Sequence, residues 1–219
     1  DGPIRFVINT HYHGDHSGSN QEMRDTGADI VAHDNVRVRM SQDNENLFWG
    51  RTIEARVPET WPNLTFSQSM TFHFNGQTVE AIHTPNAHTD GDSIIYFREA
   101  DVLHMGDNFF NDMFPYIDVD SGGSVQGMID ALDKGLSIAG PDTQIIPGHG
   151  PLSSRADMQK TREILVDIQS RVNAKINQGA DMAEIISSKP LSDYHELASF
   201  IDEENMLKIV YRSLTGKMD

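Results

Sequence analysis

The segment His11-Tyr-His-Gly-Asp-His16 directly follows Ile4–Ile8, a largely apolar run that predicts a buried strand. It places four side chains of metal-binding type within six residues, on a loop that contains a glycine. Imidazole nitrogens and carboxylate oxygens are the usual ligands of zinc and similar ions. On an extended strand end His11 and His13 point the same way, and a turn at Gly14 redirects Asp15 and His16. One loop can therefore supply ligands to two adjacent metals.

Three further residues of ligand type each follow an apolar strand. They are His88 in Thr84-Pro-Asn-Ala-His88-Thr-Asp, Asp107 in Met105-Gly-Asp107-Asn, and His149 in Pro147-Gly-His149-Gly-Pro. Loops at the strand ends of an α/β sheet are where sites are assembled over a rigid scaffold. Each of these residues taken alone is more typical of a turn, but together with the first segment they predict one shared metal-binding cluster.

Short apolar strands alternate with helical stretches along the chain, which indicates an α/β fold. We expect one domain over residues 1–219, with a helical tail over about 152–219. Asn75-Gly76 separates two alternating runs and predicts a tight hairpin. The predicted strands are 30–32, 70–74, 77–82, 93–97, 102–105 and 144–147. The predicted helices are 20–26, 36–40, 125–138, 156–176, 182–187 and 203–214, and 42–62 is predicted to be an irregular loop or flap.

Composition narrows the range of partners. The chain has 219 residues, 17 Lys and Arg against 33 Asp and Glu, and a net charge of −16. Such a surface repels phosphate backbones and anionic membranes, so we expect a small-molecule substrate, no nucleic acid and no membrane. The absence of cysteine excludes disulfides, thiolate metal ligands and cysteine nucleophiles. The oligomeric state is left open.

The order His-x-His-x-Asp-His, then His, Asp and His, resembles the metallo-β-lactamase-fold hydrolase superfamily over residues 9–150. The resemblance implies an αββα sandwich with a two-metal site along one edge. With Asp at position 107 the sequence resembles the seven-ligand, glyoxalase-II-like branch. The best-known zinc β-lactamases carry Cys or Ser at the equivalent position. The implied ligands are His11, His13 and His88 for one metal, Asp15, His16 and His149 for the other, and Asp107 as the bridge.

The same resemblance implies a metal-dependent hydrolase. A hydroxide held between two divalent ions would attack the carbonyl of an ester, thioester, lactone or lactam. Asp15 is the expected catalytic residue, orienting the nucleophile and passing a proton to the leaving group. Zinc is the expected metal, with iron and manganese as alternatives. The alternative functions are a β-lactamase proper and a non-hydrolytic member of the fold, either a redox protein or a metal-binding module.

Family members place several strands before the first histidine motif, whereas only ten residues precede it here. We therefore expect an N-terminally truncated fragment in which one sheet is short of strands. A secretion signal in the missing part would imply a periplasmic or secreted location. Outside the motifs, His33, His73 and His195 are expected to be structural or exposed, and His83 and His104 are candidates for orienting a metal ligand.

Overall fold

Two β-sheets of unequal size pack face to face in the computed structural model, which describes residues 2–217. The smaller sheet is parallel in the order β1-β2-β5. The larger sheet has the order β10-β9-β8-β7-β6 and is antiparallel except for the β9–β10 pair. The strands are β1 (Phe6–Ile8), β2 (Asp29–His33), β5 (Leu64–Phe66), β6 (Ser69–Phe74), β7 (Gln77–His83), β8 (Ser93–Phe97), β9 (Val102–Phe110) and β10 (Gln144–His149).

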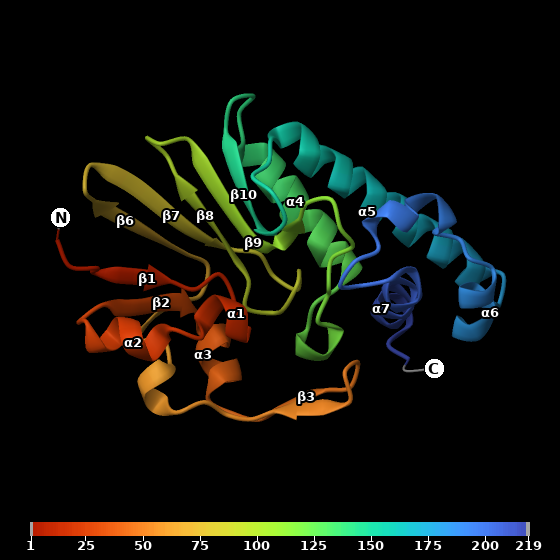
Figure 1. Ribbon diagram of the computed structural model, residues 1–219, viewed down its shortest axis with the longest axis horizontal. Helices are drawn as coiled ribbons and strands as arrows, with labels where there is room; N and C mark the ends of the chain where they lie inside the picture. Colours follow the sequence, from red (N-terminus) through yellow and green to blue (C-terminus); the bar gives the residue numbers. More distant parts are fainter. Residues whose placement is uncertain (1, 218–219) are drawn as a thin grey trace.

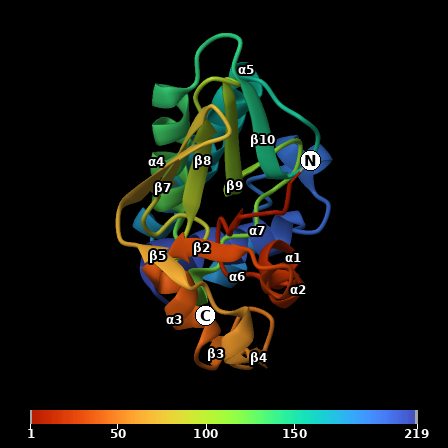
Figure 2. The ribbon, with the colours of Figure 1, turned by 90° about the vertical axis from the view of Figure 1, so that its left-hand side faces the viewer.

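Helices cover the outer face of each sheet. Helices α2 (Asn20–Asp25) and α3 (Asp34–Met40) lie against the smaller sheet, and α4 (Val125–Ile138) and α5 (Arg155–Asn177) lie against the larger one. Figure 2 shows the larger sheet standing above β2 and β5. These four layers confirm the predicted αββα sandwich, and the three strands against five confirm that one sheet is short.

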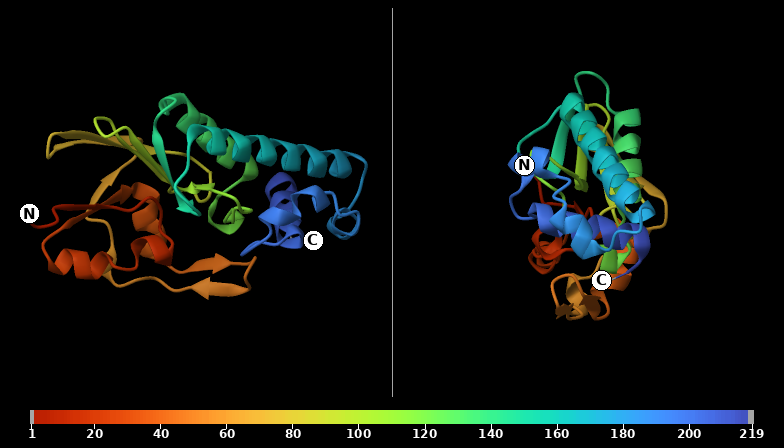
Figure 3. Two further views of the ribbon diagram at one scale, coloured as in Figure 1. Left: turned by 45° about the horizontal axis from the view of Figure 1, so that its top comes forward. Right: turned by 90° about the vertical axis from the view of Figure 1, so that its right-hand side faces the viewer.

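The space between the sheets is filled by alternating apolar side chains. Val31 of β2 and Phe66 of β5 meet Val79, Ala81 and Ile95 of the larger sheet. A second core lies between the larger sheet and its helices, and it continues into the tail formed by α6 (Met182–Ser187), a 3₁₀ segment η3 (Ser192–Leu197) and α7 (Glu203–Thr215). Figure 3 shows this tail packed at one end of α5. No helix within residues 2–217 is long and apolar enough to span a membrane.

Most predicted elements lie within a few residues of the observed ones, and three differences bear on the site. Strand β9 continues through Asp107 to Phe110, because β10 keeps pairing with it beyond a bulge and reaches His149. Gly14–Ser17 forms a short helix, α1, where a loop was expected. The segment 42–62, predicted to be irregular, contains the hairpin of β3 (Asn44–Asn46) and β4 (Arg51–Ile53), followed by the 3₁₀ turn η1 (Pro58–Thr60).

The first turn of α4 packs directly against the backbone that leads to His88. The Ser124 hydroxyl caps the helix by accepting from Gly127 N and also donates to Asn86 O, both at 2.9 Å. A Cβ on Gly127 would overlap the Asn86 carbonyl. Gly127 is therefore required by this close approach and not by its own backbone angles.

We expect Gly127→Ala to destabilise the protein by about 1–3 kcal/mol, because overpacking against backbone outweighs the ~1 kcal/mol gain in helix propensity. The matched control is Gly140→Ala, whose added Cβ would lie 3.6 Å from Thr143 Oγ1 and should change stability by no more than about 0.5 kcal/mol. Urea unfolding measures both variants. A more stable Gly127→Ala protein would show that α4 does not pack this tightly on the His88 loop.

Candidate metal centre

Four segments bring the seven predicted ligand residues to one end of the sandwich. His11 and His13 follow β1, and Asp15 and His16 lie in α1. The other three come from the larger sheet: His88 from the loop between β7 and β8, Asp107 from within β9, and His149 from the end of β10. The two sheets together therefore position the whole cluster.

The ligand-type atoms of these residues fall into three overlapping groups, within each of which all atoms lie within 4.8 Å of one another. The groups are His11, His13 and His88; His11, His16 and Asp107; and Asp15, His16 and His149. Asp107 lies at the centre of the cluster. Its Oδ1 is 3.0 Å from His16 Nε2, and its Oδ2 is 3.4 Å from His149 Nε2 and 3.6 Å from His88 Nε2.

Several of these buried polar atoms have no hydrogen-bond partner. They are His11 Nε2, His16 Nε2 and Asp107 Oδ1, because the 3.0 Å contact between the last two lacks the alignment of a hydrogen bond. Leaving such an atom unpaired costs about 1–3 kcal/mol, and native proteins contain few of them. A cation placed among these atoms would satisfy all three, so the residues present fit a metal site.

In three of these histidines the ring nitrogen that faces away from the cluster has a polar partner. His11 Nδ1 lies 3.2 Å from Thr10 Oγ1, and His88 Nδ1 lies 2.7 Å from Tyr116 O. His13 Nε2 is 3.0 Å from Asp118 Oδ2, which leaves His13 Nδ1 facing His88 Nε2 at 2.9 Å. Such partners fix the ring orientation and tautomer of metal-binding histidines.

Asp118 was not found from the sequence. It is fully buried, and besides His13 it accepts hydrogen bonds from the Tyr12 hydroxyl and from Ser121 N at the short 3₁₀ turn η2 (Val119–Ser121). Burial disfavours its charge, but the contact with His13 outweighs this and the pKa of Asp118 falls to about 2. Asp118 therefore stays ionised and holds His13 in place.

The histidines considered as orienting partners have other roles. His83 Nδ1 is bonded to Asp92 O, and its ring stacks on His33 with centroids 3.6 Å apart. His104 Nδ1 accepts from Gly106 N. Neither hydrogen-bonds to any of the seven clustered residues within the described chain. His33 is structural, since its ring caps α3 by accepting from Asn35 N.

The pKa values of the histidines differ between the two ends of the cluster. Burial lowers the pKa of His11 well below its usual value and that of His88 to about 4. Burial acts the same way on His16, but the Asp107 and Asp15 carboxylates outweigh it and raise its pKa. Contact with Asp107 raises the pKa of His149. Burial also opposes the charge of Asp107, yet the surrounding histidines, His149 foremost, hold its pKa well below the usual range.

The first glycine of the Pro-Gly-His-Gly motif, Gly148, is required because Asp107 leaves no room for a side chain there. A Cβ on Gly148 would overlap Asp107 Oδ1 and the backbone beside it. Any larger residue would displace the carboxylate from the centre of the cluster. This explains why β10 can approach β9 closely enough to bring His149 beside Asp107.

A pocket of about 740 Å³ opens beside the cluster. Its floor includes His13, Asp15, Asp107 and His149, and its walls come from the β3–β4 hairpin, from Phe110–Tyr116 and from Phe200 of the tail. This size suits a small molecule. The segment 42–62 and the helical tail therefore both contribute to the walls of the pocket.

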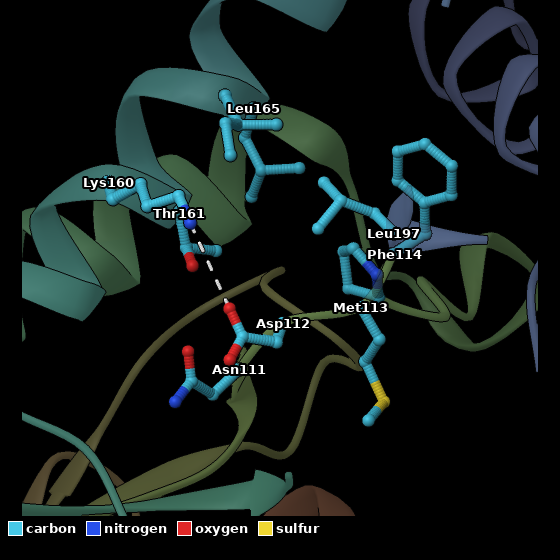
Figure 4. Close-up of a pocket in the computed structure, with 10 residues that line it drawn as sticks. Asn111, Asp112, Met113, Phe114, Lys160, Thr161, Leu165 and Leu197 are labelled. Carbon is cyan, nitrogen blue, oxygen red and sulfur yellow. Dashed lines mark ion pairs between the residues drawn. The ribbon is translucent and has the colours of Figure 1, made fainter. Parts of the chain in front are cut away.

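A second, much smaller hollow shares Met113 and Phe114 with this pocket. The hollow in Figure 4, bordered by Asn111, Asp112 and Phe114 and by Lys160 and Leu165 of α5, holds only about 10 Å³. That is roughly the space of one water molecule. Lys160 and Asp112 lie 3.9 Å apart across its mouth. Of these two spaces in the described chain, the pocket of about 740 Å³ is therefore the one that can hold a small molecule beside the cluster.

Comparisons with known proteins agree with this geometry. A relative named hydroxyacylglutathione hydrolase, from Synechococcus sp. (strain JA-2-3B'a(2-13)), is 29% identical over 104 residues, which are 48% of this chain. The chain spans about a third of that relative's length, with 34% covered.

Two solved structures show the same fold. A metallo-beta-lactamase from Pontibacter korlensis matches with a TM-score of 0.60 at 18% identity, covering 76% of this chain and 71% of that one. The inverting sec-alkylsulfatase Pisa1 from Pseudomonas sp. matches with a TM-score of 0.70 at 16% identity, covering 99% of this chain and 42% of that one. The family model of the metallo-beta-lactamase superfamily matches residues 1–160. This chain therefore belongs to the metallo-β-lactamase superfamily.

Proposed function

We propose that the protein is a hydrolase that binds two divalent metal ions and cleaves carbonyl compounds such as esters, thioesters, lactones or lactams. The observation that carries the proposal is the buried, unpaired set of His11 Nε2, His16 Nε2 and Asp107 Oδ1 beside a pocket of about 740 Å³ that Asp107 helps to line. Membership of the superfamily and the hydrolase-named relative support it. The net charge of −16 favours small molecules over nucleic acids as partners.

The two outer groups of the cluster are the proposed metal sites. His11, His13 and His88 would hold one ion, and Asp15, His16 and His149 the other. Asp107 lies between them, with its Oδ2 also 3.8 Å from His11 Nε2, and would bridge both. Five imidazoles and two carboxylates without sulfur suit zinc, and they also accept iron or manganese.

Two divalent ions bound there would lower the pKa of a water molecule between them and polarise a substrate carbonyl. The protein supplies the orientation. Asp107 is almost fully buried and fixed, whereas Asp15 faces the pocket with 58% of its side chain exposed. Asp15 Oδ2 lies 3.2 Å from His16 Nε2 and 3.3 Å from His149 Nε2. Asp15 would orient the attacking water, take its proton at Oδ2 and pass it to the leaving group.

A substrate panel on the zinc-loaded protein tests the reaction class. It contains an aryl ester, a lactone, a β-lactam and an acylglutathione, the last because of the relative named hydroxyacylglutathione hydrolase. A secondary alkyl sulfate is included because of the fold shared with an alkylsulfatase. We expect zinc-dependent turnover of at least one carbonyl compound. Turnover of the sulfate alone would show that the carbonyl assignment is wrong, and no turnover with two zinc ions bound would contradict a hydrolase of these classes.

We expect Asp107→Asn to weaken metal binding at both sites, because a charged ligand shared by both ions is lost. The loss of affinity should exceed the ~10–100-fold that is typical when a residue hydrogen-bonded to a metal ligand is substituted. Turnover should fall further than occupancy. Metal stoichiometry by elemental analysis and kcat on the best substrate of the panel measure the two effects.

The matched control for this substitution is Asp133→Asn, which removes an exposed carboxylate paired with Arg162 on the outer helices. It should leave two ions bound and turnover unchanged. Two tightly bound ions and full activity in Asp107→Asn would refute the bridging role.

Acidification should release the two ions in order, because protons compete with metals for imidazole nitrogen. The pKa values of His16 and His149 are raised above the usual histidine value near ~6.5, so their group should lose its ion first, as the pH falls through that raised range. The pKa of His88 is lowered to about 4, so its group should keep an ion to more acidic pH. Metal content after dialysis across a pH series measures this. Loss of both ions in one step would contradict the difference between the two sites.

A further inference from the structure

We propose that the pocket selects substrates that carry an aromatic group and a free carboxylate besides the scissile carbonyl, with the aromatic part packing on Trp49 and Phe200 and the carboxylate pairing with Arg51. This inference rests on the proposed function, because the pocket adjoins the proposed metal sites. It names a substrate class and the residues that choose it. None of these three residues belongs to the metal cluster.

Two exposed aromatic side chains from distant parts of the chain meet at the pocket. Trp49 lies in the turn between β3 and β4 and is 37% exposed, and Phe200 precedes α7 and is 68% exposed. Their ring centroids are 5.6 Å apart at an interplanar angle of 39°. Figure 3 shows the hairpin reaching toward the tail. Exposed apolar groups gathered at a pocket mark a surface for apolar ligands, and flat rings favour aromatic ones.

The aromatic surface continues toward the metal cluster. The Tyr116 ring lies 5.9 Å from Trp49 and 6.1 Å from the His13 ring, and Phe110 stacks on His149 with centroids 5.0 Å apart. All of these residues line the pocket. A flat molecule therefore finds a nearly continuous aromatic wall from the pocket entrance to the proposed metal sites.

Arg51 supplies a positive charge beside that wall. It lies in β4, close to Trp49, and lines the same pocket. Within residues 2–217 its side chain makes no hydrogen bond or ion pair, although acidic residues outnumber basic ones by 33 to 17. A guanidinium group pairs well with a carboxylate, by two parallel hydrogen bonds.

The other arginine of the pocket is already engaged. Arg56 donates to Tyr12 O at 2.8 Å and to Ser17 Oγ at 2.7 Å. These bonds tie it to the loop that carries His11–His16. Arg56 is therefore occupied in holding the metal loop, which leaves Arg51 as the arginine free to bind an anion in this pocket.

The hairpin that carries Trp49 and Arg51 is fixed to the body of the protein. Asn46 donates to the Tyr116 hydroxyl at 2.9 Å and accepts from Trp49 N at 3.0 Å. Phe48 N donates to Asp120, whose other oxygen pairs with Arg212 of α7. A wall held this way loses little freedom when a ligand binds, which favours selectivity.

Binding of a matched pair of probes tests the proposal without relying on turnover. Isothermal titration calorimetry with 2-naphthoate and its neutral amide, 2-naphthamide, is performed on the metal-free and the zinc-loaded protein. We expect Arg51→Gln to weaken naphthoate binding about ten-fold or more in both forms, as loss of a charge-assisted hydrogen bond implies, and to leave naphthamide within about two-fold. Trp49→Ala should weaken both probes to a similar extent, and Arg51→Lys should retain part of the preference for naphthoate.

The matched control is Arg5→Gln, which removes an arginine outside this pocket and should leave both affinities unchanged. Naphthoate binding that is equal in Arg51→Gln and the unmodified protein would overturn the proposal. So would naphthoate binding that disappears on removal of zinc, because the carboxylate would then be binding the metal. If naphthoate binding depends on Arg51 while no carbonyl compound of the panel is hydrolysed, the pocket assignment stands and the proposed hydrolase function fails.

Discussion

The buried carboxylate of Asp107 is the constraint on which the rest of the structure depends. A charged group this far from water needs counter-charge, and here it is surrounded by imidazoles that hold its pKa well below the usual range. Protonated histidines supply that charge only in part, because burial lowers the pKa of His11 and His88. A divalent cation would satisfy the carboxylate and the unpaired imidazole nitrogens together, so the residues of this site fit a metal.

The fold follows from the need to bring four segments to that carboxylate. Parallel pairing of β9 with β10 places His149 beside Asp107, and the absence of a side chain at Gly148 permits the close approach. The smaller sheet brings His11 and His13 from the opposite side. Regular elements supply the rigidity: Asp107 and His149 lie in strands, His11, His13 and His88 lie within five residues of one, and Asp15 and His16 lie in α1.

Local sequence signals predicted the elements whose stability is local. The Asn75-Gly76 hairpin forms with positive φ at both turn residues, and α4 and α6 have the predicted boundaries. The hairpin β3–β4 was missed because its strands are short and polar, and contacts with Tyr116 and Asp120 stabilise it. The close spacing of His11–His16 in the sequence likewise made their proximity predictable. Asp118 contacts His13 from 105 positions away in the chain, and no local sequence signal indicates that contact.

The two ends of the pocket are built on different principles. The metal end lies on paired strands and accepts few substitutions, because Asp107, Gly148 and the orienting contacts of the histidines are mutually dependent. The other end consists of one hairpin and one tail segment that meet through Trp49 and Phe200. Within the described chain neither ring stacks on any of the seven clustered residues, so we expect them to vary without disturbing the cluster. A fixed chemical centre beside an independently variable wall is how one scaffold can serve many substrates. We therefore expect the hairpin and the tail, and not the histidine motif, to determine which substrate binds.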